Sequence, residues 1–256
     1  MNRLLENKVI WITGASSGIG KALAIRLAKT NTVIATSRSQ EKLEQLKREY
    51  PAIVIKQADV TKPAELASVC GFIEQIFGKL DVLLANAGHC EYLDVRHFDS
   101  SIALRMIETN YMGFVYAIES CLHLLRRSET PHIVAVSSSS VYLGLPRAEA
   151  YSASKAAVTQ FMESLAADLT PEGFSLSVIH PGFVDTELTR QNDFPMPFLM
   201  QPDAAAQRII QGLNRGQYNI DFPKGLTWIL RCLRQTPHLI RHRITSSLSR
   251  NMQHEL

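Results

Sequence analysis

The stretch TGASSGIGKALA, residues 13–24, joins an apolar run to a segment of helical character, and it decides the fold class of the chain. Three glycines, Gly14, Gly18 and Gly20, stand at this junction. Such glycines permit a tight turn, let backbone N–H groups approach a pyrophosphate at a helix N-terminus, and allow a helix to pack closely on a strand. Glycine also serves ordinary loops, but its position directly after the first apolar run favours a dinucleotide-binding junction.

Outward from this junction, short β-rich apolar runs alternate with helix-like segments along most of the chain. The expected strands are Val9–Thr13, Thr32–Thr36, Ile53–Gln57, Val82–Ala85, Ile133–Val136 and Leu176–Ile179, with a weaker one at Tyr218–Asp221. The expected helices are Gly18–Lys29, Gln40–Glu49, Pro63–Phe77, Ser100–Leu125, Ser152–Leu169 and Pro202–Leu213. This alternation predicts an α/β fold, a doubly wound (Rossmann) parallel sheet of about seven strands whose ligands lie at the carboxyl ends of the strands.

The composition fits one globular domain. The chain has 256 residues, of which 46% are hydrophobic and 20% are charged, and these values argue against disorder. It shows neither a signal peptide nor a run of roughly 20 apolar residues, the length of a membrane span, so we expect a cytoplasmic protein. The four cysteines (Cys70, Cys90, Cys121 and Cys232) are scattered and suggest neither a disulfide framework nor a metal site. The net charge of +3 gives no basis for a nucleic-acid partner.

The basic charge is concentrated at the C-terminus. We expect a globular domain over residues 1–223 and a basic amphipathic extension over residues 224–256, which has one Lys and five Arg against one acid. In this extension, apolar residues follow a helical spacing while two arginines lie off that face: Leu226, Ile229, Leu230 and Leu233 against Arg231 and Arg234. Two interpretations stay open. We prefer a helix that packs on the globular body or on another subunit, and the alternative is peripheral contact with an anionic membrane.

The second expected strand ends in VIATSRSQ, where a dinucleotide fold meets the adenosine ribose. A carboxylate at this place would accept a hydrogen bond from the ribose 2′-OH. This chain has Ser37 and Arg38 instead, a hydroxyl and a guanidinium suited to a 2′-phosphate. The two residues therefore favour NADP(H) over NAD(H).

Further motifs follow in order along the chain. They are Thr13–Gly20 (TGxxxGxG), Asp59-Val60, Asn86–Gly88 (NAG), Asn110 in TNYMG, Ser138 placed 13 residues before Tyr151, Tyr151 with Lys155 (YxxxK), and Pro181-Gly182 with Thr186 (PGxxxT). Each motif is weak by itself. Because all of them occur in the order and spacing of one family, the sequence resembles the classical short-chain dehydrogenase/reductase family over most of its length.

The resemblance implies which residues form the site. The implied catalytic residues are Ser138, Tyr151, Lys155 and Asn110. The implied cofactor-binding residues are Gly14, Ser16, Ser17, Gly18, Ile19, Gly20, Ser37, Arg38, Asp59, Val60, Asn86, Ala87, Gly88, Tyr151, Lys155, Pro181, Gly182 and Thr186. By the same resemblance Lys155 bonds the nicotinamide ribose, Ser138 orients the substrate oxygen, and Asn110 holds a water that relays protons.

The spacing of Tyr151 and Lys155 also has a chemical reason. Residues at i and i+4 lie one above the other on a helix, so the phenol and the ammonium can approach a common point. Hydride transfer at a carbonyl carbon requires a proton to move at the oxygen, and Tyr151 is the expected acid/base group. A free tyrosine has a pKa near 10, and we expect the cation one turn away to favour the phenolate.

Three assignments have alternatives. Ser139 can replace Ser138 as the serine that contacts substrate, since SSSS at residues 137–140 also fits a polar loop. Asn110 can bond the backbone of its own helix. For Asn86 the alternative is a purely structural role, in which its amide ties neighbouring strands together.

The substrate side of the site is apolar in sequence. The segment ELTRQNDFPMPFLMQ lies where the family has a mobile lid. Its expected apolar wall is formed by Phe194, Met196, Phe198, Leu199 and Met200, flanked by Tyr142, Leu143 and Phe183. We therefore expect an apolar substrate.

These expectations combine into one functional prediction, an NADP(H)-dependent oxidoreductase that interconverts an apolar ketone or aldehyde and an alcohol. The alternatives are a non-catalytic NADP-binding sensor or scaffold, and a ketoacyl-thioester reductase. The helices Ser100–Leu125 and Ser152–Leu169 are apolar around most of their circumference, which predicts a homodimer or homotetramer.

Overall fold

A seven-stranded parallel sheet forms the centre of the molecule. The computed structural model describes residues 5–247. The strands are β1 (Val9–Thr13), β2 (Thr32–Ser37), β3 (Val54–Gln57), β4 (Val82–Ala85), β5 (His132–Val136), β6 (Ser175–Pro181) and β7 (Asn219–Phe222). Their order is β3-β2-β1-β4-β5-β6-β7, and all neighbouring pairs are parallel. The predicted doubly wound α/β sheet is confirmed, including the weak seventh strand.

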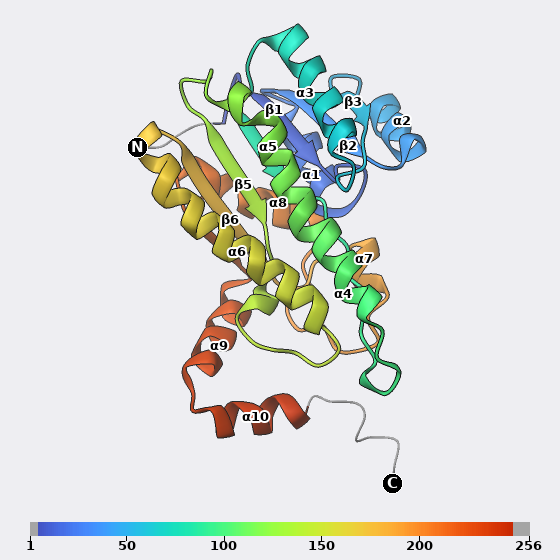
Figure 1. Ribbon diagram of the computed structural model, residues 1–256, viewed down its shortest axis with the longest axis vertical. Coiled ribbons are helices and arrows are strands. Elements are labelled where there is room, and N and C mark those ends of the chain that lie inside the picture. The colour runs from blue at the N-terminus through green and yellow to red at the C-terminus, as the bar shows by residue number, and fades with distance from the viewer. Residues whose placement is uncertain (1–4, 248–256) are drawn as a thin grey trace.

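Helices cover both faces of this sheet (Figure 1). They are α1 (Gly18–Leu27), α2 (Gln40–Glu49), α3 (Pro63–Phe77), α4 (Ser100–Met106), α5 (Gly113–Leu125), α6 (Glu149–Leu169), α7 (Glu187–Arg190), α8 (Pro202–Asn214), α9 (Lys224–Gln235) and α10 (His238–Ser247). Short 3-10 helices lie at Val95–His97, Ser139–Val141 and Thr170–Glu172, and a π-helix lies at Ile107–Met112. The helices alternate with the strands as the hydrophobic pattern predicts.

Two of the predicted helices differ from the structure. The helix predicted from Ser152 begins at Glu149, because the Ser152 N–H already donates to the Ala148 carbonyl at 2.7 Å. Ser152 resembles an N-cap in sequence, yet it lies inside the first turn. The single helix predicted over Ser100–Leu125 is divided by the π-helix, a wider turn that is common at functional sites.

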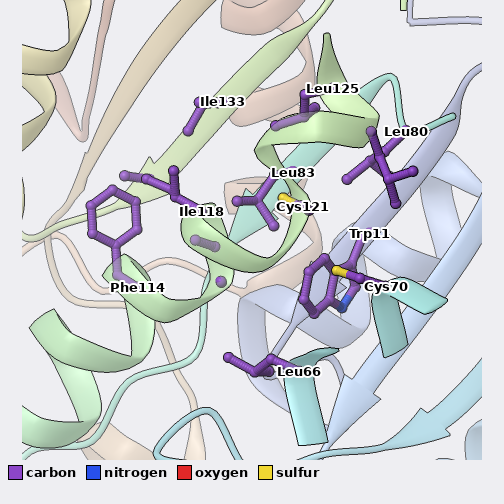
Figure 2. Close-up of a cluster of buried hydrophobic side chains, with 14 of the residues drawn as sticks. Trp11, Leu66, Cys70, Leu80, Leu83, Phe114, Ile118, Cys121, Leu125 and Ile133 are labelled. Carbon is purple, nitrogen blue, oxygen red and sulfur yellow. The ribbon is translucent and has the colours of Figure 1, made fainter. Parts of the chain in front are cut away.

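The alternation of side chains along β1 separates the core into two layers. Trp11 belongs to the layer formed with α3, α5 and α6, and Figure 2 shows it beside Leu66 and Cys70. Its indole N–H donates to the Thr36 hydroxyl at 3.0 Å, so the largest buried side chain of the described residues leaves no polar atom unpaired. The residues on either side of Trp11 in β1 face the opposite layer, which is formed with α1, α2 and α8.

The order of the strands reverses between β1 and β4, and ligands bind at such a reversal beyond the carboxyl ends of the strands. Here Asn86 Nδ2 donates to the carbonyl oxygens of Thr13 (3.1 Å) and Gly14 (3.0 Å). The Thr13 hydroxyl accepts hydrogen bonds from the N–H groups of Asn86 and Ala87, each at 3.1 Å. Asn86 therefore does tie the ends of the two strands together.

The surfaces of α5 and α6 are less exposed than the sequence suggests. Of the exposed large hydrophobic residues among those described, none lies on α5 or α6. Half-buried aromatic rings cover part of these helices, with Phe161 in edge contact with Tyr111 and Phe114. The predicted homodimer or homotetramer stays a prediction.

The C-terminal extension forms two helices, α9 and α10, at the opposite end of the long axis from α3 (Figure 1). In α9, Leu226 and Thr227 are buried against the body of the protein, whereas α10 has no buried residue. Residues 248–256 of the predicted extension lie outside the described residues. No helix of the described chain is both long and apolar enough to cross a membrane.

The close packing of the first junction can be tested at Gly20. A Cβ at this position would lie 2.3 Å from the Gly14 carbonyl oxygen and 2.5 Å from Asn86 Nδ2. We expect Gly20→Ala to lower the free energy of unfolding by about 1–3 kcal/mol, because backbone must shift to admit the methyl group. Gly71→Ala is the matched control, since a Cβ on Gly71 within α3 meets no atom within 4 Å. Urea denaturation should show a gain of roughly 0.5–1 kcal/mol for this control, and equal stability of the two variants would contradict the prediction.

Candidate active site

Two adjoining cavities lie at the carboxyl edge of the sheet, beside the reversal of strand order. The first has a volume of about 480 Å³ and extends from the glycine-rich turn to Tyr151 and Lys155. The second has a volume of about 610 Å³ and a mainly apolar wall. Ser138 and Tyr151 line both cavities, so these two side chains stand at the boundary between them.

The glycine-rich turn and the N-terminus of α1 form one end of the first cavity. Gly14 has a φ of +65°, a left-handed backbone conformation that favours glycine. Ser17, the N-cap of α1, makes no side-chain capping bond, so the first N–H groups of the helix are available to an anion. Among the predicted residues of this turn, Gly14, Ser16, Ser17, Gly18 and Ile19 line the cavity. Gly20 does not, because it lies against Gly14 and serves packing.

The far end of the first cavity is polar and basic. Arg38 and Lys42 line it, and the Ser37 hydroxyl donates to the Ser16 hydroxyl at 2.8 Å. Lys42 forms a salt bridge with Glu187 of α7 at 2.7 Å, which joins the two sides of the cavity. The exposed guanidinium of Arg38 is in the position that the sequence predicts for a 2′-phosphate contact.

The residues of the first cavity fit a dinucleotide. An uncapped helix N-terminus at one point of the cavity suits a pyrophosphate, and the basic end suits an additional phosphate. Further predicted residues that line the cavity are Val60, Asn86, Ala87, Gly88, Pro181, Gly182 and Thr186. Asp59 is an exception, since its carboxylate turns back to accept hydrogen bonds from the N–H and hydroxyl of Thr61, both at 2.9 Å.

Tyr151 and Lys155 lie on the same face of α6, as predicted. Lys155 is buried, and its ammonium donates to the Val136 carbonyl at 2.9 Å. Burial lowers the pKa of Lys155 to about 8. A Cβ on Gly88 would lie 3.0 Å from Lys155 Nζ, so the glycine of the NAG motif leaves room for the lysine.

In the structure, burial has a larger effect on the pKa of Tyr151 than the stabilisation of the phenolate that we expected from Lys155. Burial raises the pKa of Tyr151 well above its usual range, the nearby Cys90 thiol adds to the increase, and a hydrogen bond from Ser138 opposes it. Burial also raises the pKa of Cys90, to about 11. Both groups are therefore protonated at neutral pH in the protein as described, because desolvation of the charged form outweighs the neighbouring cation.

The four serines after β5 have different surroundings. Ser137 is buried and bonds the Lys155 carbonyl (3.0 Å) and the Thr159 hydroxyl (2.8 Å), so it holds α6 against β5. Ser138 is close enough to Tyr151 to lower the pKa of the phenol and lines both cavities, whereas Ser139 lines only the second. These contacts favour Ser138 over Ser139 as the serine that works with Tyr151.

Asn110 lies in the π-helix and reaches across to the loop after β4. Its Nδ2 donates to the His89 carbonyl and to the Ser154 hydroxyl, each at 2.9 Å, and its Oδ1 accepts from the His89 N–H at 2.7 Å. Nδ2 also lies 3.9 Å from Met106 Sδ one turn earlier, but none of these bonds is to the backbone of the helix that contains Asn110. The side chain fixes the loop that contains Gly88, and the water relay predicted for Asn110 stays a prediction.

The apolar cavity has a different wall from the one predicted. Of the five expected lid residues only Phe194 lines it, in edge contact with Phe183 (5.9 Å) and Tyr92 (6.1 Å) between ring centroids. The other expected residues point elsewhere: Phe198 and Leu199 are exposed, Met200 packs on the core, Met196 is partly buried beside Asn192, and neither Tyr142 nor Leu143 lines the cavity. Short loop segments have no periodicity that tells which side chain turns inward.

Several residues of this wall were not predicted. They are Cys90, Tyr92, Leu145, Pro146, Arg147, Ala148, Leu188 and Asn192, together with Leu226 and Leu230 of α9 and Ser247 of α10. Arg147 lies with its guanidinium 5.1 Å from the Tyr92 ring centroid, and the Ser140 hydroxyl, also in the wall, is buried with no hydrogen-bond partner among the described residues. Only the apolar spacing of α9 signalled any of these positions in the sequence.

Comparison with known proteins identifies the family. The sequence model of the short chain dehydrogenases matches residues 8–195. Together with the parallel sheet and the Tyr–Lys pair, this match shows that the chain belongs to the short-chain dehydrogenase family of oxidoreductases.

Individual relatives are consistent with this assignment. An uncharacterized oxidoreductase of Myxococcus xanthus is 35% identical over 232 residues, which cover 89% of this chain and 92% of the relative. An 11-beta-hydroxysteroid dehydrogenase 1A of Arabidopsis thaliana is 36% identical over 197 residues, 74% of this chain and 56% of the plant protein. A solved short chain dehydrogenase from Burkholderia cenocepacia, in complex with NADP, has a TM-score of 0.82 at 24% identity and covers 96% of this chain and 99% of its own, so it has the same fold.

The burial of Lys155 predicts a dependence of stability on pH. The folded pKa of about 8 lies below the roughly 10.4 of an unfolded lysine, so between these values the unfolded state binds more protons. We compare the free energy of unfolding of the wild type with that of Lys155→Met, both without cofactor. The difference, wild type minus variant, should therefore rise between pH 8 and about 10 by up to about 3 kcal/mol. Urea denaturation at several pH values checks this, and a difference that stays constant over the range would contradict it.

Proposed function

We propose that the protein is an NADP(H)-dependent oxidoreductase that interconverts an apolar ketone or aldehyde and the corresponding alcohol. The observation that supports this best is the position of Ser138 and Tyr151, which line both the dinucleotide-shaped cavity and the apolar cavity. A reacting carbonyl at the boundary of the two cavities would be within reach of both hydroxyls.

The chain's own residues would manage the proton and the orientation of the substrate. Ser138 donates a hydrogen bond to the substrate oxygen, and the Tyr151 hydroxyl transfers its proton to that oxygen during reduction, or accepts it during oxidation. The nicotinamide, when bound, supplies or accepts the hydride at the carbon. Lys155 stabilises the phenolate that forms when Tyr151 gives up its proton, since its ammonium lies one helical turn away.

The Tyr151 hydroxyl is protonated at neutral pH, the form that reduction requires. Because burial raises its pKa, efficient transfer of the proton depends on groups that stabilise the phenolate, and Lys155 is placed to be one of them. The basic end of the first cavity, with Arg38, favours NADPH, and the solved relative from Burkholderia cenocepacia binds NADP. A protonated acid and a reductive cofactor are consistent with each other.

The substrate is expected to be large and apolar. The second cavity has a volume of about 610 Å³, and its wall includes Phe183, Phe194 and Leu230. The plant relatives are named for hydroxysteroids, which are apolar secondary alcohols.

Replacement of the acid tests the reaction. We expect Tyr151→Phe to keep NADPH affinity and to lower turnover about 10²–10⁴-fold, because the proton donor is removed while the ring remains. The assay is NADPH oxidation with a panel of apolar aldehydes and ketones, with NADPH affinity from fluorescence titration. Tyr50→Phe, which changes an exposed tyrosine in the same way, is the matched control and should retain full turnover. Equal turnover of Tyr151→Phe and wild type would refute the role of Tyr151.

Replacement of Arg38 tests the proposed preference for NADPH over NADH. We expect Arg38→Asp to weaken NADPH binding about 10- to 100-fold, because a charge-assisted bond to the 2′-phosphate becomes a repulsion. NADH lacks this phosphate, so its affinity should be unchanged or improved. Arg48→Asp, on the exposed side of α2 and outside the cavity lining, controls for the change in net charge. Equal losses for NADPH and NADH would remove Arg38 from the phosphate site.

A further inference from the structure

The exposed apolar side chains of the protein gather at one end. Among the described residues, twelve large hydrophobic side chains are exposed, and seven of them lie on α9, α10 and the last turn of the lid. These seven are Phe198, Leu199, Trp228, Ile229, Leu239, Ile240 and Ile244, and we refer to them as the C-terminal apolar surface. Trp228 is 69% exposed and Leu239 is 78% exposed, values that are unusual for such residues unless a partner covers them.

This surface adjoins the mouth of the apolar cavity. Leu226 and Leu230 of α9 and Ser247 of α10 line that cavity, so the two helices that present the surface also form part of its wall. The Phe198 ring lies close to α9, 3.7 Å from where a Cβ on Gly225 would stand. Phe198 has a φ of +61°, a conformation that is costly for a bulky residue, yet its ring stays exposed.

Helix α9 of the extension is held in a defined place by contacts of its arginines. Arg231 of α9 bonds Asp221 and the Tyr142 hydroxyl, each at 2.7 Å, and its guanidinium lies 4.6 Å from the centroid of the Tyr142 ring. Arg234 donates to the Val141 carbonyl at 2.6 Å. Because Val141 and Tyr142 follow directly after the Ser138 loop, α9 is attached to the same segment that orients the substrate.

The charged residues in the described part of the extension, residues 224–247, are all basic. From Lys224 to Ser247 there are one lysine and four arginines, and neither Asp nor Glu occurs. Lys224 and Arg243 are exposed, and neither takes part in a salt bridge of the described chain. Basic residues beside exposed Trp, Leu and Ile are the composition of a helix that lies in the interface of an anionic bilayer.

We infer that the C-terminal apolar surface docks the protein on an anionic lipid bilayer, with the mouth of the apolar cavity directed at the membrane. A second copy of the chain fits less well. A symmetric dimer through this surface would bring two segments of five positive charges together, and like charges across an interface oppose association. The anionic bilayer neutralises the same charges and covers the apolar side chains.

The chain contains its own reporter for this docking. It has two tryptophans, and Trp11 is fully buried, so a change in fluorescence on binding reports Trp228. With the full chain and no cofactor, vesicles of phosphatidylcholine and phosphatidylglycerol should shift the emission to the blue, and brominated acyl chains should quench it. Vesicles of phosphatidylcholine alone should have a much weaker effect, and added salt should reverse the binding.

Variants separate the apolar and the charged contributions. The triple change Leu239→Gln, Ile240→Gln and Ile244→Gln keeps Trp228 and should weaken vesicle binding at least about tenfold. None of these three residues is buried, so the fold should be retained, which circular dichroism checks. Lys224→Gln with Arg243→Gln should weaken binding about 10- to 30-fold. Ile76→Gln, a residue 56% exposed on α3, is the matched control and should bind as the wild type does.

Three outcomes would overturn the inference: no spectral shift of the wild type with anionic vesicles, equal binding by the triple variant, or light scattering that shows a dimer which the triple variant dissociates. The last outcome would assign the surface to a second copy of the chain. Because vesicle binding requires neither cofactor nor turnover, its failure is distinguishable from failure of the proposed oxidoreductase activity.

Discussion

The rest of the structure depends on the tie between the ends of β1 and β4. There the Asn86 amide donates to the carbonyl oxygens of Thr13 and Gly14, and the Thr13 hydroxyl accepts two N–H groups from the strand opposite. These bonds hold the glycine-rich turn and the NAG segment together where the strand order reverses. The uncapped N-terminus of α1 and Lys155 both line the cavity at this reversal.

Desolvation determines the protonation states of the titratable groups around Tyr151. Lys155, Tyr151 and Cys90 are close together and poorly hydrated, and burial disfavours the charged form of each. The cavity therefore holds a neutral phenol beside an amine whose pKa is near 8. In the function that we propose, a carbonyl compound in the apolar cavity would meet the Tyr151 hydroxyl as its proton donor.

The C-terminal extension belongs to the site and is not an appendage. Leu226 and Leu230 line the apolar cavity, and Arg231 connects α9 through Asp221 and Tyr142 to the loop that contains Ser138. Part of the wall of the apolar cavity thus comes from the same two helices that expose Trp228 and Leu239. Together α9 and α10 combine residues that line the cavity, arginines that attach α9 to the body of the protein, and an outer apolar surface that we assign to lipid.

The sequence alone was sufficient for the strands, for the glycine turn at Gly14, for the placement of Ser37 and Arg38 at the end of β2, and for the placement of Tyr151 and Lys155 on one face of α6. These features follow from periodicity and from spacing along one element, which are local properties of the chain. Only the tertiary structure decided that burial raises the pKa of Tyr151, that Phe198 turns outward while Phe194 turns inward, and that α9 lines the cavity. Desolvation and the orientation of loop side chains depend on which distant residues pack against them, and no local pattern records that information.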